Sequence, residues 1–206
     1  VNDAIHSYGG LVMHDVINPW FAHKALEKGA DGLIAVCSGA GGHAGTLSPF
    51  GLVSEIREFF DGPIALSGSI STGAGVLGAQ AMGADYAYIG SAFIATEEAR
   101  ASEAYKQSIV DSTAEDIIYS NLFTGVHGNY LRKSIEDAGL DPNNLPESDP
   151  SAMNFGSGGN TDAKAWKDIW GSGQGVGSVK KVQSAGGYVS ELQAQYEAAK
   201  QRICGG

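Results

Sequence analysis

The chain has 206 residues, of which 43% are hydrophobic and 17% charged, a balance typical of a globular protein with a sizeable core. Thirteen basic residues against 23 acidic ones give a formal net charge of −10, which disfavours non-specific binding to nucleic acid or to an anionic membrane. No apolar run in the sequence approaches the ~18 residues of a membrane span, and no signal peptide is visible at its start.

The cysteines indicate the cellular setting, and the glycines indicate how the chain uses its loops. The two cysteines, Cys37 and Cys204, make no disulfide framework, so we expect a reduced, cytoplasmic setting. Thirty glycines exceed the average share without a collagen-like period. We therefore expect them in loops and at close backbone contacts.

Short apolar runs recur along the first 120 residues, and each interval between them has a helical pattern. The runs begin near Leu11, Leu33, Ile64, Tyr86 and Ile117. Capping residues and apolar residues at helical spacing predict helices at about 20–28, 49–60, 74–82 and 102–112. This alternation is the βα unit of a parallel sheet. Right-handed crossovers would place the loops that follow the strands on one carboxyl face.

Repeated βα units without a hairpin predict an α/β fold. A closed (β/α)8 TIM barrel has eight strands in ~250 residues, whereas the present units would leave two open sheet edges. We predict that this chain supplies about the last five βα units of such a barrel, and that another segment or chain supplies the N-terminal strands. Residues 1–120 would form the partial barrel with the site loops. Residues 121–206 would form a C-terminal helical and loop excursion with a closing helix at about 188–202, packed on the same barrel as a single domain.

The most informative loop is residues 37–45, CSGAGGHAG. Its glycines let backbone approach a ligand closely. Its histidine, His43, titrates near neutrality and suits abstraction of a weakly acidic proton from carbon. Two other interpretations stay open. The G-x-G-x-x-A spacing imitates a dinucleotide-binding loop, although Pro49 would start the helix after the motif rather than inside it. The segment is also consistent with a flexible loop that exposes His43 to solvent.

Two later loops pair glycine with serine directly after neighbouring predicted strands: Gly68 with Ser69, and Gly90 with Ser91. Backbone N–H groups of the last loops in a barrel commonly hold a phosphate. Glycine leaves room for the anion, and serine adds a hydroxyl donor. No lysine or arginine lies nearby in the sequence, so backbone amides would carry this phosphate site. Each loop alone is also consistent with a plain turn.

Other residues are weaker candidates. His14 and Asp15 end the first predicted strand and would point toward the same face, where a structural role explains them equally well. His127 lies in the excursion and could reach the site. Trp166 and Trp170 are interpreted as packing residues. The sequence has no CxxC, HExxH, Walker or GxSxG pattern, so zinc hydrolysis, nucleotide hydrolysis and serine esterase chemistry have no support.

Several stretches together resemble the nitronate monooxygenase family, formerly called 2-nitropropane dioxygenases. Residues 40–45, AGGHAG, are similar to the family's AGGHxG signature. Residues 63–70, PIALSGSI, resemble its PVIAAGGI stretch, and residues 83–93 resemble its GAxxVxxGTRF stretch. Residues 123–125 and 173–174 also match later family positions. The resemblance covers nearly the whole chain in the family's order.

This resemblance implies an FMN-dependent barrel that oxidises alkyl nitronates or nitroalkanes with O₂ to a carbonyl compound and nitrite, without a metal. By the family pattern, His43 would be the catalytic base or polar contact beside the flavin, and Gly41 and Gly42 would pass close to the flavin. The residues that would hold the FMN phosphate are Ser67, Gly68, Ser69, Gly90 and Ser91.

Two positions depart from the family pattern. Gly39 stands where the family often has glutamate, and His14-Asp15 stands where it commonly has His-Lys. A cationic contact to the pyrimidine edge of the flavin would therefore be missing or come from elsewhere. Two other functions stay open. One is an FMN-dependent NAD(P)H:quinone or enoyl-thioester reductase on the same barrel. The other is a non-catalytic barrel fragment that binds a phosphate ligand or a partner chain.

Overall fold

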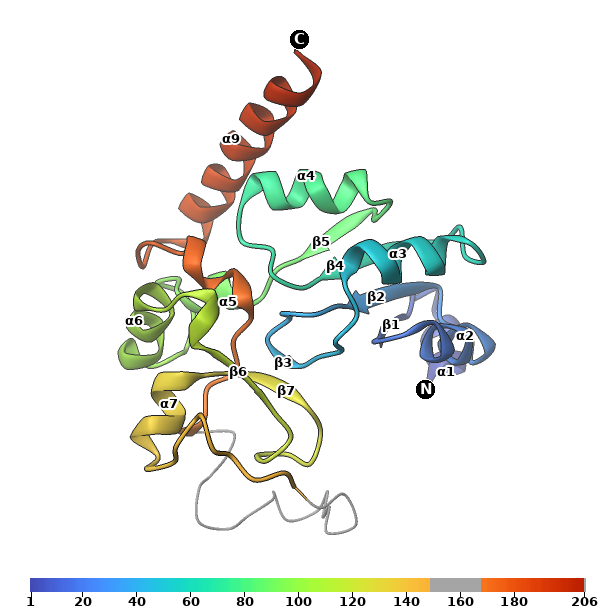
Figure 1. Cartoon of the computed structure of the whole chain (residues 1–206). Coiled ribbons are helices and arrows are strands. Elements are labelled where there is room, and N and C mark those ends of the chain that lie inside the picture. Colours follow the sequence, from blue (N-terminus) through green and yellow to red (C-terminus); the bar gives the residue numbers. More distant parts are fainter. Residues whose placement is uncertain (149–167, 206) are drawn as a thin grey trace. The chain divides into compact units, whose positions relative to one another are not determined.

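The computed structural model describes residues 1–148 and 168–205. The chain divides into two compact units, and Figure 1 labels the helices and strands along the chain. Unit 1 consists of Val1–Ser38, Gly45–Ile89 and Val189–Gly206, and unit 2 consists of Gly39–Ala44 and Gly90–Tyr188. These boundaries differ from the division at residue 120 that the sequence suggested. The single-domain organisation stays a prediction.

Unit 1 contains a parallel sheet of four strands in the order β1-β2-β4-β5. The strands are β1 (Met13–Val16), β2 (Gly32–Val36), β4 (Ile64–Ser67) and β5 (Tyr86–Tyr88). Val36 lies opposite Ser67, and Ser67 lies opposite Tyr88, so the carboxyl ends of the last three strands lie at one edge of the sheet. The four apolar runs that predicted these strands are confirmed.

Helices connect successive strands of this sheet, which makes the fold α/β as predicted. After the short α1 (Asn2–His6), they are α2 (Pro19–Glu27), α3 (Pro49–Arg57) and α4 (Gly73–Ala81). The Asn18 side chain caps α2 by accepting the Phe21 N–H at 2.9 Å, and the Thr72 hydroxyl accepts the Gly75 N–H of α4 at 3.1 Å. Local capping residues therefore decide where these helices begin.

The core of unit 1 lies between the sheet and its helices. Leu33 of β2, Leu52 and Ile56 of α3, and Ile64 and Leu66 of β4 are almost completely buried. Burying each such side chain contributes about 1.5–3 kcal/mol. The apolar face of α3 is thus held against β2 and β4, which positions the loops at the carboxyl ends of the strands.

An ion pair joins α3 to the β4–β5 region. The Arg57 guanidinium lies 2.7 Å from Asp85 Oδ2, which also accepts the Ile64 N–H at 2.8 Å. The hydrogen bond from Ile64, followed by the contact with Arg57, lowers the pKa of Asp85. The carboxylate therefore connects the start of β4 to the end of α3.

The last helix is α9 (Ala185–Cys204), which confirms the closing helix expected at the end of the chain. Its residues from Val189 onward belong to unit 1. There the Gln195 side chain accepts the Gly73 N–H at 2.9 Å. A Cβ at Gly73 would collide with the backbone of Leu192 and Tyr196, so glycine at the start of α4 permits this close approach.

Unit 2 contains an antiparallel sheet of three strands in the order β3-β7-β6. The strands are β3 (Gly42–His43), β6 (Ile117–Ser120) and β7 (Gly128–Leu131). The run near Ile117 does form a strand, but its assignment to the parallel sheet is wrong. The 121–127 connection is too short for the dozen or more residues that a parallel crossover needs, so β6 pairs with the next strand as a hairpin.

Short helices complete unit 2. They are α5 (Ser91–Ile94), α6 (Glu103–Asp111), η1 (Ala114–Asp116), α7 (Arg132–Asp137) and η3 (Gln174–Ser178). An apolar cluster consists of Tyr130 of β7, Ile135 of α7, Phe123 and Ile169. None of the helices within residues 1–148 and 168–205 is long and apolar enough to cross a membrane.

Candidate active site

His43 lies in β3 of unit 2, opposite Gly128 of β7. Its side chain is partly exposed, but pairing of the two strands holds its backbone. The backbone of this segment is therefore not a flexible loop. The exposure of the His43 side chain to solvent, which that interpretation also expected, is present. In unit 1, α3 begins at Pro49, after the 37–45 segment rather than inside it. In a dinucleotide-binding loop the helix begins within the glycine motif, and this segment does not have that arrangement.

A hydrogen bond to Thr124 orients the His43 ring. His43 Nε2 lies 2.7 Å from Thr124 Oγ1. The same hydroxyl donates its proton to Val126 O at 3.0 Å. Because a hydroxyl has a single proton, Thr124 accepts the bond from His43, and Nε2 carries the proton in the neutral ring. Nδ1 is then the basic nitrogen.

Partial burial of the His43 ring lowers its pKa from the ordinary value. Burial disfavours the imidazolium because the charge would lose hydration. A neutral ring at physiological pH is the form that can accept a proton. Orientation and pKa together leave His43 suited to act as a general base through Nδ1.

Side chains of the neighbouring strands hold the backbone on both sides of His43. Asn129 is 3% exposed, and its Nδ2 donates to Ala40 O at 2.6 Å. The Tyr119 hydroxyl donates to Ala44 O at 3.0 Å. Sequence reasoning missed Asn129 and Tyr119, and it noted Thr124 only as part of a stretch that matches the family. The two contacts fix the path of the 40–44 segment.

The two glycines before His43 differ in their surroundings. A Cβ at Gly41 would lie 2.8 Å from Gly173 N and 3.0 Å from Ser91 Oγ. Packing within unit 2 therefore explains this glycine, and it brings the predicted residues Gly41 and Ser91 side by side. Gly42 has φ +70° and nothing within 4 Å of a Cβ position. Its open side leaves room for a ligand.

Residues 173–174 pack against the segment that precedes His43. The Gly173 N–H donates to Ser91 Oγ at 2.8 Å, and the Gln174 N–H donates to Gly39 O at 2.9 Å. The family match at these two positions therefore marks a segment that packs on the loop before His43.

The loop after β4 has an unusual backbone in unit 1. Ser67 is the last residue of β4, and Gly68 and Ser69 follow with φ values of +139° and +57°. Serine in the left-handed region is uncommon and costs about 1–3 kcal/mol. Such strain is concentrated at ligand-binding positions.

The loop after β5 is also open. Gly90 has nothing within 4 Å of a Cβ position. It follows Tyr88, the last residue of β5, by two positions, and Ser91 begins α5. Ser67, Gly68 and Ser69 belong to unit 1, whereas Gly41, Gly42, His43, Gly90 and Ser91 belong to unit 2.

The weaker candidates have other contacts. His14 and Asp15 are exposed on β1, and His14 Nδ1 lies 2.9 Å from the Asp15 carbonyl oxygen. The His127 ring stacks on Tyr119, with ring centroids 5.0 Å apart. Trp170 stacks on Tyr105 at 4.9 Å, as expected of a packing residue. Trp166 lies outside the described residues.

Within the described residues, no group of three or more histidine, cysteine or acidic side chains is placed to hold a metal ion.

Comparison with known families gives the decisive observation, because the nitronate monooxygenase model matches residues 11–195. The chain belongs to the nitronate monooxygenase family. A nitronate monooxygenase of Neurospora crassa is 27% identical over 98% of this chain and 57% of that protein. Another from Paraburkholderia phytofirmans is 28% identical over 85% of this chain and 50% of that protein. The chain thus spans about half the length of these curated relatives.

Solved structures share the fold. A nitroalkane oxidase from Streptomyces ansochromogenes superposes with a TM-score of 0.77 at 26% identity, over 98% of this chain and 61% of that one. FabK from Thermotoga maritima has the same TM-score at 23% identity, over 98% of this chain and 66% of that one. The second likeness shows the fold alone.

Proposed function

We propose that the full-length protein is a flavin-dependent oxidoreductase that oxidises alkyl nitronates or nitroalkanes with O₂ to a carbonyl compound and nitrite. Membership of the nitronate monooxygenase family supports this proposal, as does the likeness to a nitroalkane oxidase. The observation that carries it is the hydrogen bond of His43 to Thr124. It leaves Nδ1 as the base of the neutral ring, which partial burial favours by lowering the pKa of His43, in the stretch that matches the family's signature.

In this proposal His43 removes the proton from the carbon next to the nitro group of a neutral nitroalkane. Thr124 keeps the ring oriented while Nδ1 accepts the proton, and the imidazolium then donates from both nitrogens. A nitronate has already lost this proton, so His43 would act on it only as a polar contact. The two substrate forms therefore depend on His43 to different extents.

FMN is the flavin we propose, and it would supply the electron transfer from substrate to O₂. Its phosphate would be held by Ser67, Gly68, Ser69, Gly90 and Ser91. The positive φ angles of Gly68 and Ser69 support this role, as does the open space beside Gly90. Gly42 has an open side that suits close approach of a flat ring system. Gly173 occupies the space beside Gly41 where a side chain would lie. Gly41 would therefore contact the flavin through its backbone atoms.

An absorbance spectrum of the full-length protein, with mass analysis of released chromophore, tests the cofactor. We expect flavin absorbance and released FMN. Nitrite release from a neutral nitroalkane and from its nitronate then tests the reaction. His43→Ala should lower the turnover of the neutral nitroalkane by about 10²–10⁴-fold, the usual contribution of a general base. Turnover of the nitronate should fall far less. Equal losses on both substrates would contradict the role of His43 as base.

The same assays separate the two alternatives. Oxidation of NAD(P)H by a quinone or an enoyl thioester, without nitrite release from nitronates, would indicate the reductase. A protein that is colourless and stays colourless with added FMN would indicate a non-catalytic fragment that binds a phosphate ligand or a partner chain.

We further propose that strands from an adjoining segment or another chain complete the barrel. Within the described residues β1 pairs only with β2, and Met13, His14 and Asp15 of β1 are exposed. A bare edge of this kind invites another strand. We also propose a reduced, cytoplasmic setting. Cys37 and Cys204 are both free thiols, of which Cys37 is buried.

A further inference from the structure

A buried tyrosine lies on the same face of the antiparallel sheet as His43. His43 of β3 is opposite Gly128 of β7, and Tyr130 follows Gly128 by two positions in β7. Residues opposite each other in a sheet, and residues two apart in one strand, share a face. A Cβ at Gly128 would lie 2.9 Å from Tyr130 Oη. The phenol therefore extends along β7 toward the position opposite His43.

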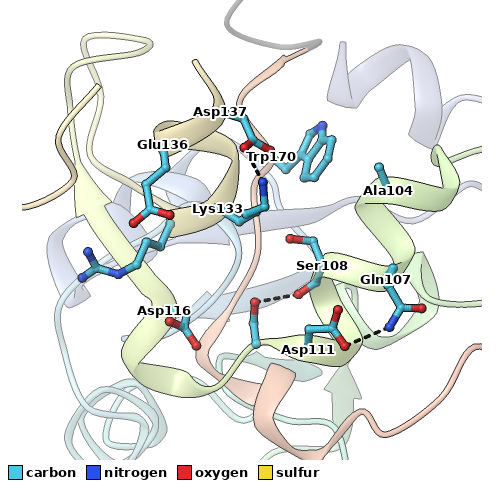
Figure 2. A pocket seen from close by; sticks show the side chains of 11 residues that line it. Ala104, Gln107, Ser108, Asp111, Asp116, Lys133, Glu136, Asp137 and Trp170 are labelled. Carbon is cyan, nitrogen blue, oxygen red and sulfur yellow. Dashed lines mark hydrogen bonds and ion pairs between the residues drawn. The ribbon is translucent and has the colours of Figure 1, made fainter. Parts of the chain in front are cut away.

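The hydroxyl of Tyr130 makes no hydrogen bond of ordinary geometry within residues 1–148 and 168–205. Tyr130 is 3% exposed, and its Oη is buried without a partner. A buried hydroxyl that donates to nothing is costly, and native proteins contain few of them. The hydroxyl does not face the pocket between α6, η1 and α7, because Tyr130 is not among the residues that line it (Figure 2).

The segment that carries Thr124 packs on this tyrosine. The Phe123 ring lies edge-on to the Tyr130 ring, with centroids 5.0 Å apart. Burial raises the pKa of Tyr130, and contact with the Thr124 hydroxyl partly offsets that rise. Thr124 is thus the polar side chain next to the Tyr130 hydroxyl, and the phenol keeps its proton near neutral pH.

Thr124 Oγ1 has a place for one more donor. It donates its own proton to Val126 O at 3.0 Å, and one lone pair accepts from His43 Nε2. The Val126 N–H also approaches Oγ1, but its 3.3 Å is longer than the 2.7–3.2 Å of ordinary N–H···O bonds. A second lone pair is therefore available to the Tyr130 hydroxyl.

We propose that Tyr130 is a positioning residue for His43 that acts through Thr124: its hydroxyl donates to Thr124 Oγ1 and keeps the Thr124 proton directed at Val126 O. This inference rests on the proposed function, in which His43 is the base. A second donor weakens the bond from His43 to the same oxygen, because linked hydrogen bonds polarise one another. The imidazolium depends on that bond more than the neutral ring does. Tyr130 thus favours the neutral ring, which can accept a proton.

The other titratable side chains near this segment lie on the opposite face. Tyr119 of β6 is paired with Asn129 of β7, the residue between Gly128 and Tyr130, and the His127 ring stacks on Tyr119. Of the titratable residues in β6 and β7, only Tyr130 shares the face of His43.

A nuclear magnetic resonance titration of the His43 ring in the full-length protein tests the proposal. The His43 signal is assigned by its loss in His43→Ala. Tyr130→Phe removes only the hydroxyl, and we expect the His43 titration to move to higher pH. Thr124→Val should move it to lower pH, because the acceptor itself is lost. In protein that already carries Thr124→Val, Tyr130→Phe should have no further effect, as expected of residues that act in series.

Nitrite release from a neutral nitroalkane gives a second readout. On the acid side of the pH profile, Tyr130→Phe should lower turnover about twofold, the effect of changing a hydrogen bond to a charged group by about 10–30%. Turnover at high pH and turnover of the nitronate should not change. The matched control is Tyr196→Phe in α9, where the hydroxyl donates to the Gln80 side chain at 2.5 Å, and it should leave both readouts unchanged. Thermal unfolding reports whether each variant is folded.

The outcomes separate this inference from the proposed function. An unmoved His43 titration in Tyr130→Phe, or an equal move with and without Thr124→Val, would overturn the role of Tyr130. Nitrite release together with an unmoved titration would refute that role alone. A titration that moves as expected in a protein that releases no nitrite would refute the oxidation and leave the coupling of Tyr130 to His43 in place.

Discussion

Thr124→Val removes the hydrogen bond between His43 and the Thr124 hydroxyl while keeping the shape of residue 124, and it also removes the bonds of that hydroxyl to the Val126 backbone. The wild-type bond joins His43 Nε2 to Thr124 Oγ1 at 2.7 Å. A net hydrogen bond contributes about 0.5–1.5 kcal/mol, and 1.4 kcal/mol is about tenfold in rate, so turnover of a neutral nitroalkane should fall about two- to tenfold. This prediction depends on the proposed role of His43 as base.

The pH dependence gives a second readout. Turnover of the neutral nitroalkane should rise with pH as His43 loses its proton, and burial places that rise below the ordinary histidine pKa of about 6.5. An acceptor at Nε2 stabilises the imidazolium more than the neutral ring. Removing it should therefore lower the pKa of His43 further and shift the rise to lower pH.

Steady-state nitrite release from a nitroalkane and its nitronate, measured across pH, is the assay. Thr124→Ser keeps the hydroxyl and should stay within about twofold of wild type in both rate and pH profile. Nitronate turnover should change little in either variant. The reasoning fails if Thr124→Val leaves rate and pH profile unchanged, or if Thr124→Ser loses as much as Thr124→Val.

Three other predictions concern stability and are read from urea or thermal unfolding. Asn129→Ala leaves the carbonyl of Ala40 without its donor and should cost about 1–3 kcal/mol, because the site is buried. Gly73→Ala should destabilise by more than about 2 kcal/mol, because its Cβ would meet the backbone of α9. Asp85 has a lowered pKa, so its contribution is present above the unfolded pKa of about 3.9 and is lost as pH falls through its folded value. Asp85→Asn should remove that pH-dependent contribution, which amounts to less than about 1 kcal/mol because the side chain is 50% exposed.

Each stability prediction has a result that would contradict it. Asn129→Ala with unchanged stability would mean that another donor satisfies the Ala40 carbonyl. The control for Gly73 is Gly78→Ala in the same helix, where a Cβ meets nothing within 4 Å and alanine should stabilise by about 0.5–1 kcal/mol. Similar losses at both glycines would refute the packing argument. If the free energy of unfolding falls at acid pH in Asp85→Asn as much as it does in the unchanged protein, the role of that carboxylate is refuted.

Local signals made much of the fold predictable. Apolar runs marked β2 and β4, and Pro49 marked the start of α3. Such signals depend on residues only a few positions apart, so they can be read without knowing the fold. The glycine loops at Gly68 and Gly90 were found for the same reason.

Two features of the structure were not predicted in this way. The strand near Ile117 was recognised as a strand, but its partner was wrong, because the pairing depends on the hairpin that residues 121–127 allow. The left-handed conformation of Ser69 was also not foreseen, since serine rarely adopts it and no local pattern requires it.

By itself, the sequence determined the order of β1, β2, β4 and β5 with the helices between them, the family signature around His43, and the two glycine-serine loops. Only the tertiary structure decided that Thr124 orients His43 across 81 residues and that Asn129 holds Ala40 across 89. Capping and apolar spacing are short-range and act within one element. A contact between distant residues depends instead on how whole strands pack, because its free energy is gained only after the intervening chain has been ordered.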